Sequence, residues 1–188
     1  YATKELDLSL EKLPKFEHEI HKKNIKFSQG KNIYEIPVVY NKNLIDFMAS
    51  YPQADYETFF NAPLDDMTYN SIAASIKEYL DGKKANEAIN FILSFVQKSF
   101  MYQRDDMQFK REKVMFAQET LYFDKSDCED RAVLFSYLIM KLLNIKAVGV
   151  KYEDHMTTAL YIPVKGDTVS IGSRKFVIAD PTYVNASA

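Results

Sequence analysis

One segment constrains the fold more than any other: residues 128–143 are apolar on nearly every side of a helix. Its apolar residues are Ala132, Val133, Leu134, Phe135, Tyr137, Leu138, Ile139, Met140, Leu142 and Leu143. A helix on the surface of a globular protein keeps one polar face, whereas a helix without such a face is buried. The sequence therefore predicts a central helix over residues 128–143, with other elements packed around it.

The residues after this helix have the alternation and turn residues of β-strands. Strands are predicted over 146–152, 155–162 and 175–180. A shorter strand over 168–171 pairs with the last of them through a Gly172-Ser173 turn. A buried helix followed by an antiparallel meander is typical of the α+β class.

The N-terminal half is less regular. An amphipathic helix interrupted near Pro14 is predicted over residues 8–26, and a strand is predicted over 34–40, where Pro37 indicates an edge or a bulge. Further helices are predicted over 43–50, 65–80, 86–102 and, within a polar and aromatic loop region at 103–125, over 112–118. These elements divide the chain into a mostly helical N-terminal extension (1–85) and a core (86–188).

Composition limits the classes of protein that the chain can belong to. With 188 residues, 47% of them hydrophobic, one domain with a substantial core is expected. The formal charge of −2 comes from basic and acidic residues mixed along the chain, which argues against nucleic acid or an anionic membrane as a partner. No apolar run reaches the roughly 18 residues of a membrane span. Tyr1 at the first position indicates a processed or trimmed chain, so the compartment stays open and includes an extracytoplasmic bacterial one.

The single cysteine excludes an internal disulfide and a cysteine-rich zinc site, and its position indicates chemistry instead. Ser126 stands three residues before Glu129, which is the capping-box pattern and predicts Ser126 as the N-cap and Cys128 as the second helical residue. The positive end of a helix favours a thiolate and can bind an oxyanion formed beside it. The carboxylates of Asp127, Glu129 and Asp130 oppose the thiolate, so Cys128 needs a histidine partner.

His155 is the predicted partner. The other histidines, His18 and His21, lie in a charged N-terminal segment, where a solvated helix explains them better than a His-x-x-His metal site. His155 opens one predicted strand, and Asp180 ends the next strand before Pro181, which holds it in an extended conformation. Adjacent antiparallel strands can bring a carboxylate to an imidazole, which orients the ring and stabilises its protonated form.

Three motifs together resemble those of a known family. The run from Ser126 to Ala132 reads Ser-Asp-Cys-Glu-Asp-Arg-Ala, a histidine opens a strand 27 residues after the cysteine (155 minus 128), and Val-Ile-Ala-Asp-Pro-Thr ends at Thr182. These motifs, within roughly residues 86–184, are similar to the Cys, His and Asp motifs of the transglutaminase-like superfamily. The resemblance implies a papain-like cysteine proteinase fold, with the nucleophile at the N-terminus of the central helix and an antiparallel sheet packed on it.

Carried over to this chain, the family's roles make Cys128 the nucleophile, His155 the base and Asp180 the group that orients the imidazole. The family usually has glycine two residues before the nucleophile, where this chain has Ser126, and often has a tryptophan close after the histidine, whereas this chain has none. Without that tryptophan, the side-chain oxyanion donor must be another residue. The available amides are Gln118 and Gln103.

The resemblance implies a cysteine hydrolase or acyltransferase that acts on an amide bond of a protein or peptide through an acyl-enzyme, with no cofactor and no metal. The alternative is an inactive transglutaminase-like domain that serves as a binding or scaffold module, with Cys128 as a buried small hydrophobe. Several aromatic residues either line a substrate cleft or cover the central helix: Tyr102, Phe109, Phe116, Tyr122 and Phe123. Spacing does not predict the substrate, the choice between hydrolysis and transamidation, or the oligomeric state.

Overall fold

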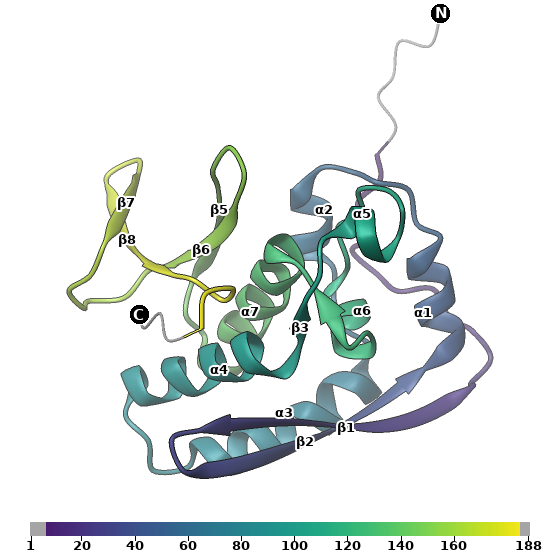
Figure 1. Cartoon of the computed structure of the whole chain (residues 1–188), viewed down its shortest axis with the longest axis horizontal. Coiled ribbons are helices and arrows are strands. Elements are labelled where there is room, and N and C mark those ends of the chain that lie inside the picture. The colour runs from purple at the N-terminus through teal and green to yellow at the C-terminus, as the bar shows by residue number, and fades with distance from the viewer. Residues whose placement is uncertain (1–6, 185–188) are drawn as a thin grey trace, which may run out of the picture.

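The fold is known from a computed structural model, which describes residues 7–184 (Figure 1). Helices and antiparallel strands are segregated along the chain, which confirms the predicted α+β class. No helix in residues 7–184 is long and apolar enough to cross a membrane.

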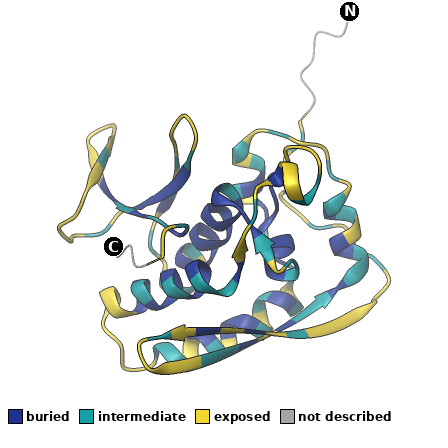
Figure 2. Ribbon diagram, in the orientation of Figure 1, coloured by how far each residue is buried: buried dark blue, intermediate teal, exposed yellow. Residues whose placement is uncertain are grey.

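Helix α7 (Cys128–Leu143) lies at the centre of the molecule and has the bounds predicted from its apolar pattern. It packs against α4 and α6 and, on another side, against β5 and β6, so nearly all of its first three turns are buried (Figure 2). Asp127, not Ser126, is the N-cap, because the Asp127 side chain accepts from the Asp130 backbone N–H. The prediction that Ser126 caps the helix was therefore wrong, and Cys128 is the first helical residue instead of the second.

A four-stranded antiparallel sheet of order β5-β6-β8-β7 packs on α7. Its strands are β5 (Ala147–Lys151), β6 (Met156–Leu160), β7 (Thr168–Ile171) and β8 (Arg174–Ala179). All four predicted strands are present, but two are shorter than predicted. His155 immediately precedes β6 and Asp180 immediately follows β8. Both side chains are therefore on loops at the same end of two adjacent strands.

The N-terminal region begins with a β-hairpin instead of the helix predicted over residues 8–26. Strand β1 (Ile20–Gln29) pairs with β2 (Asn32–Asn41), and residues 7–19 form neither helix nor strand. Ile25 and Phe27 are buried two residues apart, which is the period of a strand, and the Phe27 ring packs on Phe91 and Phe95 of α4. The predicted strand over 34–40 is confirmed as part of β2.

In the described part of the chain, six further helices lie between the N-terminal hairpin and the four-stranded sheet, all of them before α7. They are α1 (Lys42–Ala49), α2 (Tyr56–Asn61), α3 (Asp66–Leu80), α4 (Ala85–Ser99), α5 (Asp105–Gln108) and α6 (Ala117–Tyr122). The predictions for α1, α3 and α4 are confirmed, except that α4 ends at Ser99. The next two residues form β3 (Met101–Tyr102), which pairs in parallel with β4 (Lys125–Ser126). The helix predicted over 112–118 was misplaced, because residues 112–116 are irregular and α6 begins at Ala117.

One hydrophobic core joins the two predicted parts of the chain. It runs from Leu10 to Ala179 and includes residues of β1, β2, α4, α7 and the C-terminal sheet. Strand β1 packs on α4 and β2 on α3, so residues before 85 complete the same core as those after it. The outer ends of the predicted extension and core, at residues 1–6 and 185–188, lie outside the described part of the chain.

Candidate functional site

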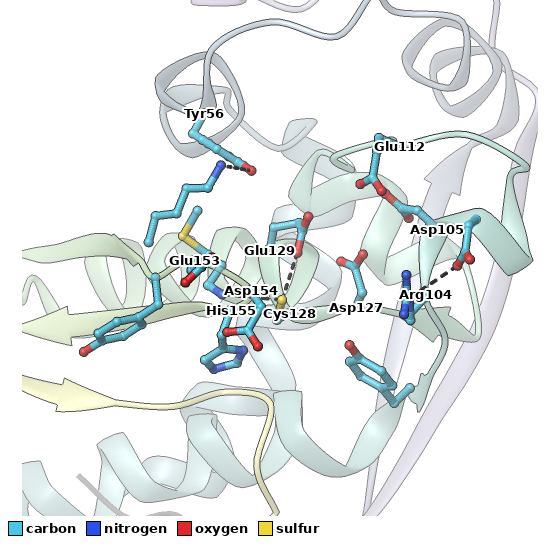
Figure 3. A pocket seen from close by; sticks show the side chains of 15 residues that line it. Tyr56, Arg104, Asp105, Glu112, Asp127, Cys128, Glu129, Glu153, Asp154 and His155 are labelled. Carbon is cyan, nitrogen blue, oxygen red and sulfur yellow. Dashed lines mark hydrogen bonds and ion pairs between the residues drawn. The ribbon is translucent and has the colours of Figure 1, made fainter.

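Cys128 lies at the N-terminus of α7, against the start of β6. The Met156 backbone N–H donates to its Sγ atom at 3.4 Å, and its relative exposure is 8%. The sulfur borders a cavity of about 460 Å³ that is also lined by His155 (Figure 3). The predicted nucleophile and the predicted base therefore share one open cavity.

His155 and Asp180 are joined directly. The Nε2 atom of His155 lies 2.7 Å from Oδ2 of Asp180, and both side chains are largely buried. Strands β6 and β8 create this contact because their register pairs Thr158 with Ala179, which places the residues flanking the two strands beside each other. With Nε2 bonded to the carboxylate, Nδ1 is the ring nitrogen that remains for a thiol proton.

The loop after Asp180 holds the carboxylate in this position. The other carboxylate oxygen, Oδ1, accepts from the backbone N–H groups of Thr182 and Tyr183 at 2.8 and 3.3 Å. The Gln97 side chain of α4 donates to the carbonyl oxygens of Asp180 and Tyr183, each at 2.8 Å. Asp180 is thus fixed by its own loop and by α4, which leaves Oδ2 to orient the imidazole.

Arg131 ties the start of α7 to this loop. The buried guanidinium donates to Ser126 Oγ at 3.0 Å, to the Phe100 carbonyl at 2.7 Å and to the Thr182 carbonyl at 3.3 Å. Ser126, which was predicted to cap the helix, serves instead as an acceptor for this arginine. The contacts join β4, the end of α4 and the Asp180 loop around one planar group.

Replacing Arg131 with lysine should destabilise the fold by about 2 kcal/mol, because an ammonium cannot reproduce three hydrogen bonds of fixed direction, two of them buried. Urea unfolding followed by circular dichroism measures this change. Arg111→Lys, at an exposed position, is the matched control and should alter the free energy of unfolding by less than about 0.5 kcal/mol. Equal effects of the two substitutions would show that the Arg131 contacts do not stabilise the fold.

The Cys128 thiol is held in its protonated form. It donates to Oε2 of Glu129 at 2.9 Å, and among the described residues no hydrogen bond joins it to His155. Burial, this hydrogen bond and the charges of Glu129 and Asp127 together raise the pKa of Cys128 to about 12, although the Met156 N–H acts in the opposite direction. The sequence-based expectation that the acidic neighbours oppose the thiolate agrees with this geometry. Proton transfer to His155 thus requires that the contact with Glu129 be broken first.

The cavity beside Cys128 is strongly acidic. Among the described residues that line it, the basic ones besides His155 are Arg104 and Lys151, against seven carboxyl groups: Asp105, Asp106, Glu112, Asp127, Glu129, Glu153 and Asp154. Burial and the neighbouring charge of Asp130 raise the pKa of Asp127 to about 10, and burial raises that of Asp105 to about 6. Asp127 and Glu129 were predicted from the sequence to lie near the sulfur, whereas the other five were not. The sequence does contain a signal for some of them. Two adjacent acidic pairs, at 105–106 and 153–154, stand within a few residues of the predicted site residues Gln103 and His155.

Neither predicted oxyanion amide lies at the cavity. Gln118 is buried, its Oε1 accepts from the Asp65 N–H at 2.9 Å and its Nε2 donates to Thr68 Oγ1 at 3.0 Å, so it anchors α6 to the start of α3. Gln103 Oε1 accepts from Lys125 Nζ at 3.1 Å. We therefore do not retain either amide as an oxyanion donor.

Tyr102 is the aromatic residue from the predicted set that lines the cavity. Burial and the charges of Cys128, Asp127 and Glu129 raise the pKa of its hydroxyl, so the phenol is a neutral donor near the sulfur. The other four aromatic residues pack elsewhere: Phe116 on Phe59 and Tyr51, Phe109 on Phe123, and Tyr122 on Tyr40 and Phe123.

His18 and His21 lie away from this site, on the exposed N-terminal segment and on β1. His21 pairs with Glu19 and stacks on Tyr40. Within residues 7–184, the one group of side chains with the spacing of metal ligands is Asp105, Asp127 and Glu129, and it includes no histidine.

Comparison with known proteins found no matching family model, no matching curated protein and no matching solved structure.

Proposed function

We propose that this chain is a cysteine hydrolase or acyltransferase with a papain-like, transglutaminase-like core, acting on an amide bond of a protein or peptide. One observation carries the proposal. Asp180 is hydrogen-bonded to His155, and the residue after His155 donates its N–H to the sulfur of Cys128 at the mouth of an open cavity. This combination of a nucleophile, a base and a group that orients the base is the pattern of nucleophilic catalysis.

In the proposed reaction, Nδ1 of His155 accepts the thiol proton and the Cys128 sulfur attacks the carbonyl carbon of the substrate. The electron pair of the C=O bond moves to oxygen, and the resulting oxyanion is stabilised by the N-terminal N–H groups of α7 and by the Tyr102 hydroxyl. Collapse of the tetrahedral intermediate breaks the C–N bond, and His155 gives its proton to the leaving amine. Water or a second amine then attacks the thioester and releases the acyl group from sulfur.

Glu129 adds a condition to this reaction. Because the resting thiol donates to Glu129, the substrate must displace that carboxylate or satisfy it before the proton can reach His155. The same contact is the observation that favours the second candidate function, a binding module whose cysteine is inactive. The two candidates differ in whether Cys128 can be acylated.

An activated ester tests this difference. With p-nitrophenyl acetate, the wild-type chain should release a burst of about one equivalent of p-nitrophenol, as expected for a covalent acyl-enzyme, and intact mass should show one acetyl group. Cys128→Ala should abolish the burst, and Asp180→Asn should slow acylation by about 100-fold or more, because the imidazole loses its orienting carboxylate. The exposed His18→Ala variant should retain the burst. An identical burst from the wild-type chain and from Cys128→Ala would exclude the proposal, and no burst from either would favour the binding module.

A further inference from the structure

Three carboxylates lie close together in the cavity that Cys128 lines. Asp105 is the first residue of α5, Asp127 caps α7, and Glu129 is the second residue of α7. One carboxylate oxygen from each lies within 4.8 Å of the others. Glu129 also accepts a hydrogen bond from the Cys128 thiol, so this acidic cluster adjoins the atom proposed to attack the substrate (Figure 3).

Asp105 is incompletely satisfied by the protein itself. Its side chain is buried, with a relative exposure of 3%, and Oδ2 accepts from the Lys113 backbone N–H at 2.6 Å. The other oxygen, Oδ1, is buried and has no hydrogen-bond partner among the described residues. An unpaired buried carboxylate oxygen is costly in a native structure, and it indicates a missing partner when it borders a cavity.

Among the described residues, no basic side chain of the cavity forms an ion pair with this cluster, although Lys151 is close enough to Glu129 to interact with its charge. Arg104 lies 3.4 Å from the carboxylate of Asp106, and Lys151 donates to the Tyr56 hydroxyl at 3.1 Å. The exposed rim adds further negative charge from Glu112, Glu153 and other acidic residues. A cavity lined by one sign of charge concentrates the opposite charge inside it, so this cavity attracts cations.

We propose that Asp105, Asp127 and Glu129 form a subsite for the cationic side chain of a lysine or arginine next to the amide bond that is attacked. This inference rests on the proposed function and names its substrate class as a basic peptide segment. The cavity also contains the rings of Tyr56 and Tyr102, which suit an ammonium or guanidinium group because aromatic faces attract organic cations. A guanidinium can donate at once to the carboxylates of Glu129 and Asp105, including the unpaired oxygen of Asp105. Burial raises the pKa of Asp127 to about 10, so this group meets the cation as a neutral acceptor at pH 7.

Such a ligand would also release the nucleophile. When the cation donates to Glu129, this carboxylate no longer needs the thiol as its donor. The charge that raises the pKa of Cys128 is then neutralised, and the thiol proton can move to Nδ1 of His155. Binding of the correct side chain would therefore favour the reactive arrangement of sulfur and imidazole, whereas with a neutral side chain the thiol would stay on Glu129 for more of the time.

Charged thiol reagents test the electrostatic part of this proposal without any need for catalysis. Because the chain has one cysteine, a trimethylammonium methanethiosulfonate and its sulfonate counterpart both report on Cys128 alone. The measured quantity is the rate with the cationic reagent divided by the rate with the anionic one. This ratio should be more than about tenfold larger for Cys128 than for 2-mercaptoethanol, as expected in a focused negative potential. Asp105→Asn and Glu129→Gln should each reduce this preference severalfold, whereas the exposed Asp167→Asn should not. Equal preference in the wild-type chain and in 2-mercaptoethanol would overturn the proposal.

Peptide binding tests the ligand itself. The Cys128→Ala chain keeps the three carboxylates and cannot react, so calorimetry with a short arginine peptide and with its citrulline isostere measures recognition alone. The arginine peptide should bind at least about tenfold more tightly, and Asp105→Asn in this background should remove the difference.

Equal affinities would overturn the subsite even if the acyl-enzyme forms, and a preference for arginine without an acyl-enzyme would refute only the proposed catalysis. Tight binding of Ca²⁺ or Mg²⁺ that Asp105→Asn abolishes, together with no preference for arginine, would identify a metal site and overturn the peptide subsite.

Discussion

Replacing His155 with alanine should slow the alkylation of Cys128 by iodoacetamide at pH 7 by about 100-fold or more, because the thiol then has no general base. The structure raises the pKa of Cys128 to about 12. A thiol with this pKa and no partner has a thiolate fraction of only about 10⁻⁵ at pH 7. In the wild-type chain, each time the thiol leaves Glu129, proton transfer to Nδ1 of His155 can create a thiolate–imidazolium pair that reacts at a much lower pH. Mass spectrometry of the whole chain gives the rate, since it contains one cysteine.

Two controls separate this effect from a change in folding. His18→Ala removes an exposed histidine and should leave the alkylation rate unchanged. Glu129→Gln should increase the rate, because it removes the negative charge that helps to raise the pKa of the sulfur. If the wild-type chain titrates like an ordinary thiol near pH 8.5, and His155→Ala titrates in the same way, Cys128 and His155 do not act together.

The free energy of unfolding should fall by about 4 kcal/mol or more between pH 5 and pH 8, because buried carboxyls near Cys128 keep their protons in the folded state. Burial raises the pKa of Asp105 to about 6 and that of Asp130 to about 7, and burial with the charge of Asp130 raises that of Asp127 to about 10. In the unfolded chain these groups ionise near pH 4. Above that pH the folded state binds more protons than the unfolded state, so stability decreases as pH rises through the folded pKa values. Urea unfolding at pH 5, 6.5 and 8 measures the decrease.

A neutral isostere should flatten this pH dependence. Asp105→Asn keeps an oxygen that can accept from the Lys113 N–H but cannot ionise, so it should remove about 1.4 kcal/mol of the decrease. Asp167→Asn changes an exposed carboxylate and should leave the slope as it is in the wild-type chain. Constant or increasing stability from pH 5 to pH 8 would show that the carboxyls near Cys128 ionise freely in the folded protein.

The predictable elements of the fold are those whose signals are local. Helix α7 has the predicted bounds because its apolar pattern extends over every face, and α3 starts after Asp65, whose side chain caps it. Helix α2 was missed, because it is short and lies between Pro52 and Pro63. It is stabilised by tertiary packing, including the contact of Phe59 with Phe116. A contact between residues so far apart in the chain cannot be predicted from a local pattern.

The hairpin was mispredicted for a similar reason. Strand β1 carries lysines on its exposed positions and only two buried hydrophobic residues, Ile25 and Phe27. With other nearby hydrophobic residues, these two fit a helical spacing about as well as a strand. The strand is favoured because Phe27 packs against the rings of Phe91 and Phe95 in α4, which lie more than 60 residues away in the chain.

In the candidate site, too, some residues could be predicted from local patterns and others could not. Cys128, His155 and Asp180 could be proposed from the sequence because each stands at the end of a recognisable helix or strand. Gln118 and Gln103 could not be assigned correctly, since only the fold shows that their amides face Thr68 and Lys125. The acidic cluster could not be predicted either, because it requires α5 to place Asp105 against the start of α7. Catalysis and the transglutaminase-like relationship stay predictions.

The hydrogen bond from Cys128 to Glu129 also bears on the survival of the protein under oxidative stress. Peroxides attack thiolates, and the resulting sulfenic acid can proceed to irreversible sulfinic and sulfonic acids. This chain has no second cysteine that could rescue a sulfenic acid as an internal disulfide. A sulfur that stays protonated and donates to a carboxylate until a ligand arrives should therefore resist peroxide during the intervals between encounters. The contact that delays the first chemical step would in this way protect the only thiol that the chain has.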